Sequence, residues 1–129
     1  MIKRLIDIDG YWKVIVYYNV NYNLFHIIEK DLYKINCTDY QIDSIYNNMI
    51  NKRAKAVTIS SIDYKTSVVL FNNHTSYIDY INSIIHEAEH VKQHMLKAYN
   101  VADEGEPPAY TVGYIAMRML TINPKLKLL

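Results

Sequence analysis

The longest regular pattern in the sequence is a helical one over residues 76–100, and it constrains the fold more than any other feature. Ser76 is a good helix N-cap, and the apolar residues after it recur every three or four positions. The predicted apolar face contains Ile78, Ile81, Ile84, Ile85, Ala88, Val91 and Met95. Such a helix is expected to be buried along one side, so the rest of the chain has to supply a surface for it to pack against.

Shorter segments on either side of this helix have patterns of their own. Residues 11–20 are rich in β-branched and aromatic side chains and predict a strand, and residues 56–62 and 66–71 predict a hairpin. Helices are expected over residues 24–35, from the N-cap Thr38 to about Lys52, and from Glu106 to about Thr121. Pro124 is expected to end the last helix.

The order of these elements favours one α+β domain over residues 1–129. A strand, two helices, a hairpin, the long helix, a loop and a last helix follow one another, with no internal repeat and no evident linker. Half of the residues are apolar, which is enough to build a core. We expect a small antiparallel sheet with the helices packed on one of its faces.

Composition excludes several classes of protein. The 14 basic and 13 acidic residues nearly cancel and are scattered, which argues against a nucleic-acid partner. Cys37 is the one cysteine, so there is no internal disulfide and no thiolate zinc site. Asp7 and Asp9 interrupt the apolar N-terminal run, and no segment approaches the length of a membrane span. We therefore expect no signal peptide, no membrane partner and a cytoplasmic location.

The long predicted helix carries the segment His86-Glu87-Ala88-Glu89-His90, which fits the pattern H-E-x-x-H. Residues four apart share one face of a helix, so the imidazoles of His86 and His90 can converge on one zinc ion. Glu87 is then turned toward the water that zinc would activate, where it can act as general base. The alternative is a solvated face on which histidines and glutamates pair along the helix.

A catalytic zinc ion needs a third protein ligand and an open fourth position. His94 continues the row of histidines, but it lies about 12 Å from His86 along the helix axis, too far to share the ion. Glu106 opens the last predicted helix, and a short loop could return it toward the metal. Glu104 and Asp103 are alternatives, more typical of solvated loop charges.

Small residues follow Glu106 on the same predicted helix face. Ala109 lies one turn later, and Gly113 continues this face. Small side chains at these positions would permit close approach of the last helix to the long one. A nearby hydrogen-bond donor for an oxyanion could come from Tyr110 or Tyr114, although core tyrosines are the alternative.

The motif followed by a glutamate in an E-x-x-A context resembles the gluzincin group of zincin metallopeptidases, and the short chain with its hairpin resembles the minigluzincins. The resemblance implies a zincin-like fold, zinc bound by His86, His90 and Glu106, and Glu87 as catalytic base. It also implies a peptide or protein substrate, with strand 66–71 as the sheet edge that pairs with an extended peptide.

Two functions therefore remain open from the sequence. The first is a small zinc metalloendopeptidase, which the intact base Glu87 favours. The second is a non-catalytic zincin-like binding or accessory module in which any metal is structural. The substrate and the oligomeric state are not indicated by any pattern.

Overall fold

A computed structural model describes residues 1–121, and within them the expected α+β class is confirmed. The strands are β1 (Ile2–Ile8), β2 (Trp12–Tyr18), β3 (Ala56–Ser61) and β4 (Thr66–Phe71). The helices are the 3-10 turn η1 (Tyr22–Leu24), α1 (Phe25–Lys34), α2 (Asp39–Ile50), α3 (Tyr77–Ala98) and α4 (Glu106–Thr121). The helix stop expected at Pro124 lies outside the described residues.

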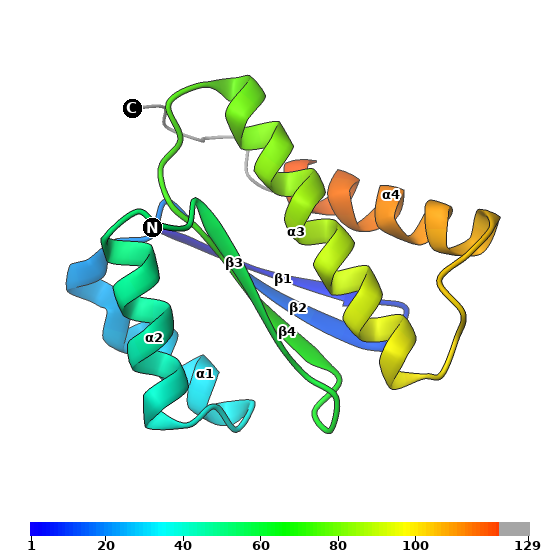
Figure 1. Ribbon diagram of the computed structural model, residues 1–129, viewed down its shortest axis with the longest axis horizontal. Helices are drawn as coiled ribbons and strands as arrows, with labels where there is room; N and C mark the ends of the chain where they lie inside the picture. The colour runs from blue at the N-terminus through cyan, green and yellow to red at the C-terminus, as the bar shows by residue number, and fades with distance from the viewer. Residues whose placement is uncertain (122–129) are drawn as a thin grey trace.

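The strands form one mixed sheet in the order β1-β2-β4-β3 (Figure 1). The β1–β2 and β3–β4 pairs are antiparallel, whereas β2 and β4 run parallel. The prediction of a purely antiparallel sheet is therefore wrong. Helices α1 and α2 stand between β2 and the β3–β4 hairpin in the chain, and a connection of this length lets β4 return beside β2 in the same direction.

Strand β1 was not predicted from the sequence. Its burial alternates, with Ile6 and Ile8 buried and Leu5 exposed. The turn that follows contains Asp9 and Gly10, both with positive φ angles, 50° and 77°. Asp-Gly between two apolar runs is a hairpin signal, so the turn could have revealed the strand.

Helices cover both faces of the sheet, which corrects the expectation that they share one face. Successive side chains of a strand point to opposite faces, so β2 and β4 contribute to two cores. The core under α3 and α4 includes Ile6, Trp12, Val14, Tyr18, Phe71, Ile84, Val91 and Ile115. The core under α1 and α2 includes Tyr17, Ile28, Leu32, Ile42, Met49, Val68 and Leu70.

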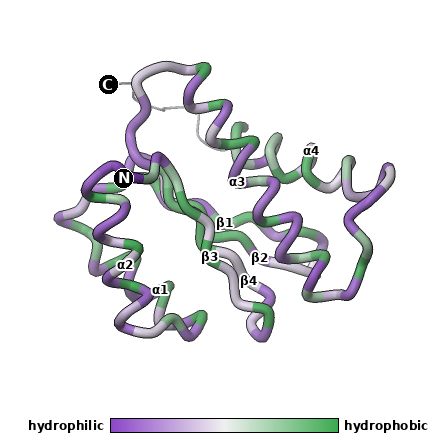
Figure 2. The backbone as a smooth tube through the Cα atoms, viewed as in Figure 1, coloured by the Kyte–Doolittle hydropathy of each residue, from purple (hydrophilic) through white to green (hydrophobic). Residues whose placement is uncertain are grey.

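Helix α3 begins as predicted, because the Ser76 side chain accepts a hydrogen bond from the Asp79 backbone N–H at 3.1 Å. Its apolar face is narrower than the sequence indicated, since Ile78 and Ile85 are 81% and 54% exposed. Figure 2 shows hydrophobic and hydrophilic residues mixed along this helix, as expected for one buried side. Among the described residues, no helix combines the length and apolar character that crossing a membrane requires.

The sheet edge beside α3 is β3, and this determines how the site can be reached. β4 lies between β2 and β3 and is buried along its whole length, so the expectation that residues 66–71 form an edge is wrong. β3 is half-buried throughout, and no other described strand pairs with its outer side. A continuous apolar run such as that in β4 is typical of a central strand.

Candidate metal and catalytic site

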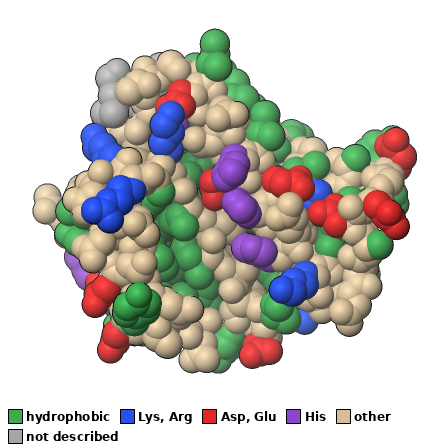
Figure 3. All heavy atoms as spheres, viewed as in Figure 1, with side chains coloured by type: hydrophobic (Ala, Val, Ile, Leu, Met, Phe, Trp, Pro, Cys, Tyr) green, Lys and Arg blue, Asp and Glu red, His purple; other side chains and the backbone are tan. Residues whose placement is uncertain are grey.

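The two motif histidines converge on the surface of α3. Their Nε2 atoms lie 3.1 Å apart, and the ring centroids of His86 and His90 are separated by 4.7 Å in an edge-to-face arrangement. The His86 side chain is 67% exposed and that of His90 is half-buried. Figure 3 shows histidine side chains gathered in a row in the middle of one face of the molecule. The helical spacing therefore produces the predicted pair.

The geometry of this pair can be compared with what zinc requires. Imidazole nitrogens bind zinc at about 2.0–2.1 Å, so two of them at a tetrahedral angle lie about 3.3 Å apart. The separation of 3.1 Å between the His86 and His90 Nε2 atoms is close to that value. At this separation the two nitrogens share a hydrogen bond, which a bound zinc ion would replace, and imidazole is a donor type that suits zinc. The pair fits two of the ligand positions of a zinc site.

Glu87 is buried beneath the histidine pair, with 4% of its surface exposed. Its Oε1 atom accepts a hydrogen bond of 2.9 Å from the Thr58 hydroxyl of β3, and its Oε2 atom lies 3.9 Å from His86 Nε2. Burial raises the pKa of the Glu87 carboxyl, while the Thr58 hydrogen bond and the charges of His86 and His90 oppose that rise. A raised pKa brings a carboxylate closer to the range that suits a general base at neutral pH.

An open groove of about 320 Å³ leads to Glu87 between the start of β3 and the side of α3. It is lined by Ala54, Lys55, Ala56, Asn82, Ser83, His86 and Glu87. The groove lies beside the first residue of β3, and the outer side of this strand pairs with no other described strand. Behind it, the buried His74 side chain meets the Ser83 hydroxyl through Nε2 at 2.8 Å.

The structure does not bring Glu106 to the histidine pair. Within residues 1–121, no three His, Cys, Asp or Glu side chains are grouped so that they could hold a metal ion. Glu106 lies on the exposed first turn of α4, which begins at one end of the molecule and runs back toward α3 (Figure 1). Ala109 and Gly113, which share its helix face, are exposed as well. This face therefore points to solvent, and the expected close approach through small residues does not occur.

The other loop carboxylates are placed differently from one another. The Asp103 side chain forms an ion pair of 2.8 Å with Lys92 of α3, whose ammonium also meets Glu89 at 2.7 Å. The ion pair between Asp103 and Lys92 thus holds the loop after α3 against this helix. Glu104 is exposed, as expected for a loop charge.

The two tyrosines considered as oxyanion donors are not directed at the histidine pair by any described contact. Tyr110 is 74% exposed on the first turns of α4. The Tyr114 hydroxyl accepts a hydrogen bond of 2.8 Å from Arg118 on the same helix. Tyr114 is half-buried against the core under α3 and α4, which agrees with the alternative of a core tyrosine.

His94 is held more firmly than the sequence suggested. It is half-buried, and its Nδ1 atom lies 2.6 Å from the Ser60 hydroxyl of β3. Burial, followed by the charges of His90 and Lys97, lowers the pKa of His94. Thr58 and Ser60 were missed as site residues, although the two-residue period of a strand places both on the face of β3 that α3 covers.

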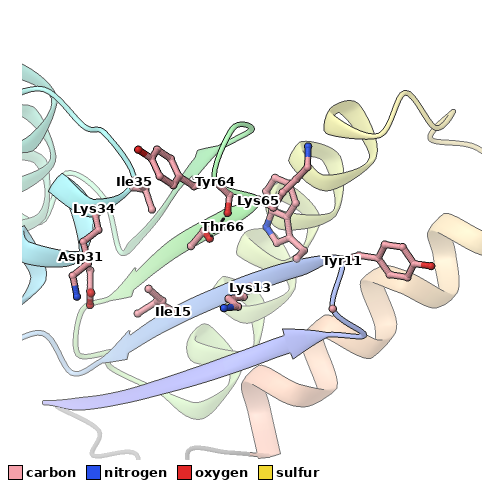
Figure 4. A pocket seen from close by; sticks show the side chains of 11 residues that line it. Tyr11, Lys13, Ile15, Asp31, Lys34, Ile35, Tyr64, Lys65 and Thr66 are labelled. Atoms are coloured by element: carbon pink, nitrogen blue, oxygen red, sulfur yellow. Dashed lines mark hydrogen bonds between the residues drawn. The ribbon is translucent and has the colours of Figure 1, made fainter.

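A second cavity, of about 360 Å³, contains none of the predicted site residues. It lies between the C-terminal end of α1, the start of β2 and the β3–β4 turn, and Figure 4 shows the side chains around it. Three lysines line it, Lys13, Lys34 and Lys65. The Lys65 ammonium is already placed over the Tyr99 ring, 4.9 Å from its centroid.

Comparison with protein-family models, with curated proteins and with solved structures finds no match to this chain.

Proposed function

We propose that this protein is a small zinc-dependent peptidase in which His86 and His90 hold the metal and Glu87 is the general base. The observation that carries the proposal is a buried carboxylate placed beside two converging imidazole nitrogens. A structural pair of histidines needs no such neighbour, whereas a hydrolytic site needs a base next to its metal.

The chain's own residues supply the proton transfers. Glu87 takes a proton from the attacking water and returns it to the leaving amine. Thr58 donates to one carboxylate oxygen and leaves the other, 3.9 Å from His86 Nε2, free for that exchange. When bound, zinc would acidify the water and polarise the scissile carbonyl.

The unpaired edge of β3 is the feature that supports an extended peptide as substrate. An added strand would form backbone hydrogen bonds with β3 and pass the groove that leads to His86 and Glu87. This assigns to β3 the part that the resemblance gave to residues 66–71. The class of substrate that follows is a peptide or an unfolded segment of a protein.

Glu106 is our candidate for the third ligand, on the resemblance alone. Because it lies on the solvent face of α4, it can reach the pair only if the first turn of α4 changes position relative to α3. Glu106→Ala should lower zinc affinity at least tenfold, and Glu104→Ala, on the neighbouring loop, should leave it unchanged. Equal zinc affinity in the wild type and Glu106→Ala would remove Glu106 from the ligand set.

The test of the proposed reaction is Glu87→Gln, with Glu89→Gln as the matched control on the same helix. We expect Glu87→Gln to keep one zinc per chain by elemental analysis and to lose hydrolysis of a fluorogenic peptide library by a factor of about 10²–10⁴. Glu89→Gln should keep both the bound zinc and the wild-type rate of hydrolysis. Hydrolysis at the wild-type rate by Glu87→Gln would disprove the mechanism.

A non-catalytic binding module is the second candidate function. The observation in its favour is that residues 1–121 contain no group of three potential metal ligands. Such a module would bind an extended peptide along β3 without cleaving it. Peptide binding by the zinc-loaded wild type, with no cleavage of any library member, would select this function over the first.

A further inference from the structure

Four polar side chains form a continuous hydrogen-bonded chain from the sheet core to α3. The Trp12 indole Nε1–H donates to the Ser67 hydroxyl at 2.9 Å. The Ser67 and Ser60 hydroxyl oxygens lie 2.6 Å apart, and Ser60 lies 2.6 Å from His94 Nδ1. Ser60 and Ser67 are direct partners in the β3–β4 register, which places their side chains on the same face.

The chemistry of Trp12 fixes the direction of this chain. An indole N–H can donate but cannot accept, so the Ser67 oxygen has to be the acceptor. The single Ser67 hydrogen then has one hydrogen-bonding neighbour left among the described contacts, the Ser60 oxygen. Ser60 in turn gives its hydrogen to His94 Nδ1. In this direction the indole N–H and both serine hydrogens have an acceptor.

The opposite direction leaves one hydroxyl hydrogen without a partner. If His94 Nδ1 carried the hydrogen and donated to Ser60, Ser60 would either donate to Ser67 or accept from both His94 and Ser67. In the first arrangement the hydrogen of the fully buried Ser67 has no acceptor among the described contacts, and in the second the hydrogen of the half-buried Ser60 has none. An unsatisfied buried hydroxyl costs about 1–3 kcal/mol. The neutral His94 ring is therefore held with Nδ1 as acceptor and its hydrogen on Nε2.

The Nε2–H group of His94 stands at the end of the histidine row. The His90 and His94 ring centroids are 6.0 Å apart, and no hydrogen bond joins Nε2 of His94 to another described residue. Along β3, Thr58 contacts Glu87 and Ser60 contacts His94, so the strand passes both side chains in order. A peptide paired with the outer edge of β3 would pass both side chains, in the same order if parallel to β3 and in the reverse order if antiparallel.

We infer that His94 is a substrate-binding residue, whose Nε2–H donates a hydrogen bond to a backbone carbonyl of a peptide lying along β3, and that it is not a zinc ligand. Trp12, Ser67 and Ser60 are positioning residues that fix its tautomer. The tautomer follows from the chain of hydrogen bonds alone, whereas the substrate contact rests on the proposed function. Binding zinc through Nε2 would place the hydrogen on Nδ1 and leave the hydrogen of either Ser60 or Ser67 without an acceptor.

The tautomer is tested by ¹⁵N NMR of the imidazole side chains in the metal-free protein. We expect His94 to carry its hydrogen on Nε2 only, and we expect Ser60→Ala to introduce the Nδ1–H form. Ser60→Thr keeps the hydroxyl and should restore the wild-type pattern. Ser60 is half-buried on an edge strand, so both variants should fold. A His94 that carries its hydrogen on Nδ1 in the wild type overturns the inference.

The substrate contact is tested with His94→Ala, using the fluorogenic peptide that the zinc-loaded wild type cleaves fastest. One lost hydrogen bond of about 1–1.5 kcal/mol should raise KM roughly tenfold and leave kcat within about twofold. Zinc content should remain at the wild-type level. Loss of zinc in His94→Ala, or an unchanged KM, overturns the assignment of His94.

The two proposals fail in different ways. If the zinc-loaded wild type cleaves no peptide, the proposed peptidase activity is wrong. The proposed hydrogen bond from His94 to a peptide substrate is then wrong as well. The NMR result still decides the tautomer in that case. If cleavage is normal and His94→Ala has a normal KM, the peptidase proposal stands and the His94 assignment alone is wrong.

Discussion

Among the described residues, each face of the sheet has one carboxylate that is almost fully buried, and the two have different partners. On α1, the Asp31 carboxylate accepts a hydrogen bond from the Tyr17 hydroxyl and pairs with the Lys3 ammonium at 2.8 Å. On α3, the Glu87 carboxylate accepts a hydrogen bond from the Thr58 hydroxyl, and no lysine or arginine is paired with it in the described residues. Asp31 is neutralised by its surroundings, and Glu87 is not.

This difference separates a structural carboxylate from a functional candidate. Burying a charge is costly unless a partner of opposite charge compensates for it. A buried carboxylate without such a partner is therefore a candidate for a functional role. At Glu87, a cation held by His86 and His90 would supply the missing positive charge. The comparison therefore predicts opposite responses when each carboxylate is removed.

The largest effect on stability is expected for Asp31→Ala. The substitution leaves the buried Tyr17 hydroxyl without its acceptor and Lys3 without its partner, which should lower the free energy of unfolding by about 2 kcal/mol. Urea unfolding measures the change, and Asp43→Ala on the exposed side of α2 is the control. Zinc binding should be unaffected. A loss equal to that of the control would mean that Asp31 is not the structural member of the comparison.

A smaller effect of opposite sign is expected for Glu87→Gln in the metal-free protein. The folded pKa of Glu87 is raised above its usual value of 4.5, so wild-type stability falls as the pH rises from about 4.5 through the folded pKa. A neutral amide removes this loss and can still accept from Thr58. Calorimetry at pH 7 should show a melting temperature a few degrees higher than that of the wild type.

Glu89→Gln is again the control for this stability measurement, because Glu89 is on the same helix and is compensated by Lys92. It should not raise the melting temperature. If Glu87→Gln is less stable than the wild type at pH 7, Glu87 is a structural carboxylate, and the contrast between the two faces disappears.

The smallest effect concerns His74, which lies behind the groove and is buried. Burial lowers its pKa below 6.5, so the unfolded chain binds more protons in acid. Stability from neutral His74 is complete above pH 6.5 and is lost as the pH falls through 6.5 toward the folded pKa. When the pH falls from 7.5 to 5.5, the free energy of unfolding measured in urea should decrease less for His74→Gln than for the wild type. His26→Gln, a substitution at an exposed position, is the control and should show the same decrease as the wild type. Equal losses in all three proteins would contradict this.

Local sequence signals account for the elements that carry the site. Thr38 and Ser76 cap α2 and α3 as predicted, because capping depends on one side chain and the next three residues. The convergence of His86 and His90 also follows from the helical spacing alone. These features involve contacts between residues at most four positions apart.

Long-range features were not predictable in the same way. The parallel β2–β4 pair and the two covered faces depend on where the α1–α2 connection crosses the sheet, and no local pattern specifies that. The position of Glu106 depends on the rotation of α4 about its axis, which Ile115 and Met119 set by packing into the core. The pairing of Ser60 with His94 needs both the hairpin register and the placement of α3 over it.

The open edge of β3 also bears on how the purified protein will behave. An unpaired strand edge is a template on which two copies of a chain can associate and aggregate. Here the edge is six residues long and includes Thr58, Ser60 and Ser61. A short strand with polar side chains is a poor template for stacking, so this edge can stay accessible to a peptide with less tendency to bring copies of the protein out of solution.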